Sequence, residues 1–278
     1  MSKLVSPSPV RPFRAVSLAA TALALGIVTA ACQEQGTAPD GDTTSSPAAT
    51  GGLKIGSLLP ATGDLASVGQ PMLAAVPLLV DTVNQCGGVN GAPVTLVPNT
   101  DDQTDPTAGA DGMTKLAEVD KVAGVVGSFA SSVSSAAAPI AARNRVMRIS
   151  PGSTSPVFTE RAKKGEFQGF WARTAPPDTY QAQALAKLAY DKGSRRVSTV
   201  VINNDYGVGF EREFVQAFKQ LGGTVINEAK PTRYDPKATT FATEVQAAFS
   251  GQPDAVVAVA YAETGALLLK TAYEQGLK

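Results

Sequence analysis

Hydrophobic positions along residues 53–278 follow two periodicities in turn. Short aliphatic runs such as VAGVV at 122–126 are typical of buried strands, and the segments between them carry apolar residues every three or four positions, as one face of a helix does. The pattern predicts strands at 53–59, 94–98, 122–126, 146–149, 167–173, 197–202, 224–227 and 255–260, and helices at 68–83, 107–119, 131–143, 180–192, 210–221, 240–249 and 265–275. Regular alternation with short connections favours parallel sheets covered by helices on both faces.

The alternation is interrupted once, at TAPPD (174–178), and then restarts. We therefore predict an α/β fold of two doubly wound parallel-sheet lobes, an N-terminal lobe at 53–174 and a second lobe at 175–278. In such folds ligands bind beyond the carboxyl ends of the strands or between domains. The loops after the strands that end at 59, 126, 149, 202 and 260 are therefore the places where binding chemistry is expected.

The N-terminal residues read as export signals. Three basic residues and no acidic ones precede an apolar run at 15–28, which is too short to span a bilayer but suits a signal peptide. Small residues then lead to Cys32, as in a bacterial lipobox, which predicts a signal peptide at 1–31 and lipidation of Cys32. Ordinary secretory cleavage after Ala30 or Ala31 is the alternative. Residues 32–52 hold no aliphatic side chain larger than alanine and are predicted to be a flexible lipoprotein tether.

Composition excludes several classes of function. The chain has 24 basic and 24 acidic residues, so its net charge gives no general attraction to nucleic acid. It has no histidine, which excludes Ser-His-Asp and Cys-His catalytic sites and the histidine-containing zinc motifs. Two cysteines are too few for a thiolate zinc cluster or a disulfide framework. We expect neither a metal, a cofactor nor an enzymatic activity.

Four of the five loops carry polar or aromatic groups suited to a small ligand. Ser131 begins a helix, where backbone N–H groups and the helix dipole favour an anion; simple capping of that helix is the alternative. The loop at 150–155 gathers hydroxyls and a glycine, which a plain turn would also explain. Tyr206 and Tyr261 follow two strands of the second lobe. The pair Asp101 and Asp102 is interpreted as solvated capping rather than as a catalytic dyad.

A series of short segments resembles the periplasmic branched-chain amino acid binding protein family. The segments occur in the family's order: KIG at 54–56, NQCGGVNG at 84–91, TDDQTDP at 100–106, ISPGSTSP at 149–156, FWARTAPPD at 170–178, DYGVG at 205–209 and PDAVV at 253–257. The resemblance covers essentially all of 53–278. It implies the type I periplasmic binding protein fold, in which two lobes close on a ligand.

The resemblance also implies roles for six residues. The ligand carboxylate would be held by Ser131 and by the backbone and hydroxyl groups of Gly152, Ser153 and Thr154, and Tyr206 and Tyr261 would close over the ligand. Val68 stands where the family often has an aromatic, which leaves specificity for leucine or valine open. The family's ammonium-binding acid lies beyond the stretch present here, and we transfer that role to neither Asp205 nor Glu263.

The function implied is that of the extracytoplasmic solute-binding component of an ABC importer, which captures a branched-chain or other small neutral amino acid, or a related amide. Its partners would be that ligand, the ABC permease subunits and, through the lipid anchor, a bacterial membrane at the periplasmic or cell-surface side. A ligand-sensing receptor domain of the same fold and a non-functional fragment are the alternatives. Family chains continue past the position of Lys278, so we expect the C-terminal part to be missing and this chain to bind ligand poorly.

Overall fold

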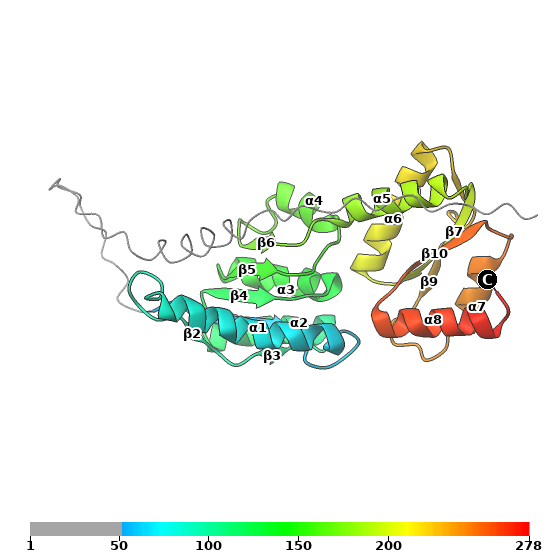
Figure 1. The fold of residues 1–278 in the computed structure, drawn as a ribbon. Helices are drawn as coiled ribbons and strands as arrows, with labels where there is room; N and C mark the ends of the chain where they lie inside the picture. Colours follow the sequence, from blue (N-terminus) through cyan, green and yellow to red (C-terminus); the bar gives the residue numbers. More distant parts are fainter. Residues whose placement is uncertain (1–51, 278) are drawn as a thin grey trace, which may run out of the picture. The chain divides into compact units, whose positions relative to one another are not determined.

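The chain divides into two units, Met1–Ala48 and Ala49–Lys278, and the computed structural model describes residues 52–277, which belong to the second unit. Figure 1 shows the helices and strands of these residues, coloured in chain order. The predicted signal peptide, Cys32 and all but the last residue of the tether therefore lie outside the described residues.

The first lobe contains a sheet and the helices connecting its strands. Its elements are β1 (Lys54–Leu59), α1 (Ala66–Gln85), β2 (Thr95–Leu96), β3 (Thr100–Asp101), α2 (Pro106–Thr114) continued by the π-helix η2 (Lys115–Val119), β4 (Gly124–Gly127), α3 (Ser131–Arg143), β5 (Met147–Ser150), α4 (Val157–Lys163) and β6 (Trp171–Arg173). The strands lie in the order β2-β1-β4-β5-β6, with β3 also paired to β1, and all of these pairs are parallel. Parallel pairing brings the carboxyl ends of β1, β4 and β5 to one edge of the sheet, with Leu58 opposite Gly127.

The second lobe repeats the scheme with four strands. Its elements are α5 (Asp178–Asp191), β7 (Arg196–Ile202), α6 (Asp205–Gln220), β8 (Thr224–Val225), β9 (Thr232–Tyr234), α7 (Ala242–Phe249), β10 (Ala255–Val259) and α8 (Ala262–Glu274). The strand order is β10-β7-β8, with β9 paired to β7, and every pair is again parallel. This topology confirms the predicted α/β class with parallel sheets and crossover helices.

Each lobe buries its own core between sheet and helices. In the first lobe, Leu58 and Val125 of the sheet pack against Met113 and Leu116 and against Ala137 of α3. In the second lobe, one face of the sheet is covered by α5 and α6 and the other by α7 and α8. The largest side chains of these two cores are Phe210, Phe214 and Phe218 on one face, and Tyr234 and Phe241 on the other.

Three parts of the fold differ from the prediction. The strand predicted at 94–98 is only β2 (Thr95–Leu96), since Pro98 has no N–H to donate to a ladder, and β3 (Thr100–Asp101) follows it where no strand was predicted. Helix α4 was not predicted, since Phe158 is its only buried residue and it shows no apolar periodicity. Strand β9 was missed because three residues, buried, exposed and buried in turn, are too short to give a clear alternation.

Helix α1 leaves much of its apolar surface uncovered. Val76 and Val80 are buried, whereas Leu78, Leu79 and Val83 are 67%, 64% and 39% exposed. Among the described helices, α1 alone is long and apolar enough to cross a membrane by length and composition. An apolar cavity of about 240 Å³ lies beside it, lined by Leu53, Ile55, Val76, Leu79, Val80, Val83, Val89, Val94 and Val126.

Candidate functional site

Helix α3 starts directly after the loop that follows β4, and its first turn offers free donors. Ala130 is the N-cap and supplies no side-chain cap, and the first bond of the helix runs from Ser134 N to Ala130 O at 3.0 Å. The N–H groups of residues 131–133 therefore lack a partner within the helix, and they concentrate its positive dipole end. Ser131 is the first helical residue and not the cap, so the capping interpretation is wrong. Its Oγ accepts a hydrogen bond from Ser155 N at 3.3 Å.

The loop after β5 is held in place by serine hydroxyls. Ser150 Oγ accepts from Gly152 N at 3.3 Å and from Ser153 N at 2.9 Å, and it donates to Ser128 O at 2.6 Å. The Ser153 side chain is fully buried, with its Oγ 2.7 Å from Ser134 Oγ. The Ser153 hydroxyl is thus engaged inside the lobe. The N–H groups of Gly152 and Ser153 are engaged as well, so the part of the loop left for a ligand is Thr154.

Thr154 contacts a buried carboxylate that sequence reasoning missed. Its Oγ1 donates to Asp178 Oδ2 at 2.9 Å, and Asp178, the first residue of α5, is 1% exposed. Asp178 Oδ1 is buried without a hydrogen-bond partner. Burial raises the pKa of Asp178 to about 6, against the lowering effects of the Thr154 bond and of the positive charge of Arg173. The signal in the sequence was an aspartate directly after two prolines at a helix start, where we predicted only a break.

The two predicted tyrosines lie together at the start of α6 and α8. Their rings stack with centroids 5.9 Å apart and planes 6° from parallel. Asn204 caps α6 by accepting from Tyr206 N at 3.1 Å, and its Nδ2 donates to Tyr261 Oη at 3.0 Å. Burial, with a smaller contribution from the charge of Asp178, raises the pKa of Tyr206 to about 12. Tyr206 therefore lies within electrostatic reach of Asp178, the carboxylate bonded to Thr154.

Further contacts connect these loops across the sequence. Tyr261 packs against the cluster formed by Leu65, Ala130 and Val133. A Cβ on Gly209 of α6 would lie 2.6 Å from Ser155 Oγ, so only a glycine lets α6 approach this loop so closely. The structure thus brings Ser131, the 152–154 loop, Tyr206 and Tyr261 into one neighbourhood, and it adds Asp178.

A cleft of about 540 Å³ opens beside this neighbourhood. It is lined by Asp64, Gln103, Thr104, Asp105, Pro106, Thr107, Ala108, Asp111, Ser132, Asn203, Asn204, Pro236, Lys237 and Tyr261. Lys237 Nζ lies 3.0 Å from Asp105 Oδ2, and Ser67 Oγ donates to Glu263 Oε1 at 3.0 Å. Glu263 is exposed and already bonded, so it is less suited than Asp178 to receive a buried cation.

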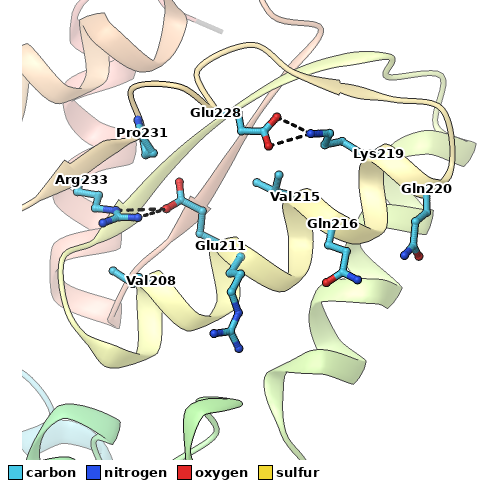
Figure 2. A pocket seen from close by; sticks show the side chains of 10 residues that line it. Val208, Glu211, Val215, Gln216, Lys219, Gln220, Glu228, Pro231 and Arg233 are labelled. Atoms are coloured by element: carbon cyan, nitrogen blue, oxygen red, sulfur yellow. Dashed lines mark hydrogen bonds and ion pairs between the residues drawn. The ribbon is translucent and has the colours of Figure 1, made fainter. Parts of the chain in front are cut away.

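A larger cavity, of about 720 Å³, lies beside α6 and shares no lining residue with this cleft; Figure 2 shows its side chains. Residues of α6, of β9 and of the segment before β9 line it, and its carboxylates have partners within it. Arg233 Nη2 lies 3.1 Å from Glu211 Oε2, and Lys219 Nζ lies 2.9 Å from Glu228 Oε1. Because these charges are paired with one another, the cavity presents no buried unpartnered group comparable to Asp178.

Metal chemistry has no support in the part of the chain that the structure describes. Residues 52–277 contain no group of three or more His, Cys, Asp or Glu side chains placed to hold a metal ion.

Comparison with known proteins identifies the family. Residues 52–278 match the family described as periplasmic binding protein, which is most of the chain. The chain belongs to the periplasmic binding protein family. This agrees with the resemblance to the branched-chain amino acid binding proteins and with the two-lobed α/β fold.

Three relatives show how this binding protein compares with others. It is 30% identical over 171 residues to Leu/Ile/Val-binding protein homolog 1 of Brucella melitensis, which covers 60% of this chain and 44% of that protein. It is 33% identical over 122 residues to metabotropic glutamate receptor 8 of Homo sapiens, which covers 44% of this chain and 13% of the receptor. The crystal structure of a leucine binding protein, LivK of Thermotoga maritima, superposes with a TM-score of 0.68 at 30% identity, over 81% of this chain and 61% of that one.

The chain spans less than half the length of these two curated relatives. The comparisons support an extracytoplasmic solute-binding role, since the family and the solved structure are binding proteins rather than enzymes.

Proposed function

We propose that this binding protein captures a small neutral amino acid, of the branched-chain type or close to it, between its two lobes. The observation that carries the proposal is the buried Asp178 carboxylate, whose Oδ1 has no partner and whose Oδ2 is bonded to Thr154. A buried carboxylate of this kind is stabilised by a cationic partner. A ligand ammonium would supply one.

The other end of an amino acid finds complementary groups on the first lobe. The N–H groups of residues 131–133 and the hydroxyl of Ser131 are suited to a carboxylate, since a helix N-terminus stabilises an anion. The family resemblance also assigns the 152–154 loop to the carboxylate, but Gly152 N and Ser153 N are already bonded to Ser150 Oγ, so the free donors of this chain are those at the start of α3. The stacked Tyr206 and Tyr261 offer apolar ring faces to a side chain.

Capture would follow from a shift between open and closed forms. Each lobe supplies part of the site, so a ligand that bridges Ser131 of the first lobe and Asp178 and the tyrosines of the second has a higher affinity for the closed form and increases its population. The binding protein would then serve an ABC importer as its extracytoplasmic component, held to the membrane through lipidated Cys32. Two relatives, a Leu/Ile/Val-binding protein homolog and a leucine binding protein, support this ligand class.

The proposal is tested by titrating the protein with leucine and with 4-methylpentanoate, which lacks the ammonium, while following NMR chemical shifts so that weak binding is also measured. We expect Asp178→Asn to weaken leucine binding about tenfold or more, the size of one hydrogen bond to a charged group. Binding of 4-methylpentanoate should change little, because that ligand has no cation to lose a partner.

Asp191→Asn serves as the matched control, because Asp191 lies at the far end of the same helix and is bonded only to Lys187. Equal weakening of both ligands by Asp178→Asn would contradict the assignment of the ammonium. An absence of shifts with any amino acid would contradict the proposed function.

A second candidate is a ligand-sensing receptor domain of the same fold. The similarity to metabotropic glutamate receptor 8 over 122 residues supports it. The two candidates differ in context: a permease gene beside the coding sequence supports transport, whereas a transmembrane helix downstream in the same chain supports sensing.

A further inference from the structure

An arginine lies fully buried behind the first-lobe loops. Arg148, in β5, is 0% exposed. Its Nη2 donates to Ser134 Oγ at 2.7 Å, its Nη1 to Ser134 O at 3.2 Å and its Nε to Gly127 O at 3.1 Å. All three bonds go to neutral groups.

One hydroxyl connects this guanidinium to the loop after β5. Ser134 Oγ accepts from Arg148 and from Ser153 Oγ, each at 2.7 Å, and donates to Ser128 O at 3.2 Å. These bonds use both lone pairs and the proton of Ser134. The arginine is therefore connected to the Ser153 side chain through a single intermediate atom, and the carbonyl oxygens of Ser128, Phe129 and Ala130, 3.0–3.3 Å from Ser153 Oγ, hold that side chain as well.

The positive charge of Arg148 has no close counter-charge. No ion pair among residues 52–277 includes it, and the acidic group that influences it is Asp102. Asp102 is 0% exposed; its Oδ1 accepts from Thr104 N at 2.9 Å and its Oδ2 has no partner. The interpretation of Asp102 as a solvated cap is thus wrong. Asp101, by contrast, does cap a loop, because it accepts from Ala61 N and Thr62 N.

The protonation states favour a net positive charge at this place. Burial raises the pKa of Asp102 to about 7, with a contribution from Asp101, while Thr104 and Arg148 oppose the rise. Burial lowers the pKa of Arg148 to about 9, against the effect of Asp102. Below pH 7, a charged Arg148 therefore faces a mostly neutral Asp102.

We propose that Arg148 is a positioning residue that makes the Ser131 and 152–154 loops selective for a ligand carboxylate over an uncharged group. The proposal rests on the proposed function. A charge held in a low-dielectric lobe acts strongly on a nearby anion, because no water screens it. Its hydrogen bonds also fix the Ser134–Ser153 pair that shapes the loop.

The test compares leucine with leucinamide, which keeps the ammonium and side chain but lacks the negative charge. NMR titrations at pH 6 give the ratio of the two affinities for the wild type and for Arg148→Met. We expect the wild type to prefer leucine and Arg148→Met to reduce that preference roughly fivefold or more, while leucinamide affinity stays within about twofold. Arg148→Lys, which keeps the charge, should retain part of the preference.

Arg143→Met is the control, since Arg143 is a surface residue of α3 bonded to Glu118. Equal loss of both affinities in Arg148→Met would indicate a structural role and overturn the proposal, as would an unchanged ratio.

If Arg148→Met does not fold, the variant Asp102→Asn provides the test instead. The leucine affinity of the wild type relative to that of Asp102→Asn should fall between pH 6 and pH 8, because Asp102 ionises only in the wild type, and a ratio that stays constant overturns the proposal. A wild type that binds neither compound overturns the proposed function, and this proposal with it.

Discussion

Asp102 offers a direct measurement of what burial of a carboxyl costs this fold. Its side chain is fully buried, and its pKa is raised to about 7 chiefly by burial. Asp102→Asn keeps the shape and keeps an oxygen that can accept the hydrogen bond from Thr104 N, but it removes the proton equilibrium. The variant therefore isolates the titration of one group.

The sign and size of the effect follow from the two pKa values. The Asp102 carboxyl has a pKa of about 7 in the folded state and 3.8 in the unfolded state, so between these values the folded state binds a proton that the unfolded state has lost. The protonated carboxyl therefore adds to the free energy of unfolding. This addition is complete below pH 4 and is lost as the pH rises to about 7. Between pH 5 and pH 8 the free energy of unfolding of the wild type should fall by about 2–3 kcal/mol more than that of Asp102→Asn.

Urea denaturation followed by circular dichroism at pH 5, 6, 7 and 8 measures this difference. Asp101→Asn is the control: burial raises the pKa of Asp101, but bonds from Thr62, Gln103 and Ala61 outweigh it and lower the pKa. That group is ionised in both states above pH 5, so the control should keep the wild-type slope. Parallel pH profiles for the wild type and Asp102→Asn would refute the reasoning.

Two further predictions concern the site and the membrane. Ser131→Ala should weaken amino-acid binding at least several-fold in calorimetry, since it removes one hydroxyl donor at the start of α3. The control is Ser135→Ala, which removes a hydroxyl bonded to Arg161. Equal affinities of the Ser131 variant and the wild type would exclude the assigned role. Cys32→Ala should move the exported protein from the membrane fraction to the soluble fraction, and a variant that still sediments with membranes would argue against lipidation.

The sequence was sufficient for the long elements, because each buries a periodic apolar face. Helix α3 begins and ends at the predicted residues 131 and 143, and Phe210, Phe214 and Phe218 of α6 are buried as their spacing indicates. Short elements were missed where burial rests on one or two residues. Phe158 of α4 stacks on Trp171 with centroids 4.6 Å apart, a contact that no local pattern reveals.

The site was predictable in part for a similar reason. Loops after parallel strands converge on one edge, so Ser131 and Thr154 could be assigned from topology and resemblance. Asp178 and Arg148 could not, since their roles depend on burial and on partners 24 and 14 positions away, Thr154 and Ser134. The residues next to a charged side chain in the sequence do not indicate whether that side chain will be buried in the fold.

The uncovered face of α1 has a practical consequence for work in solution. Leu78 and Leu79 are exposed, and the aliphatic cavity of about 240 Å³ opens beside them. Dyes such as ANS, which fluoresce on contact with exposed apolar surface and are used to detect molten globules, should bind this face of the intact protein. A bright dye signal at the start of a melting curve would then report the native helix, and unfolding has to be followed by a signal from the backbone instead.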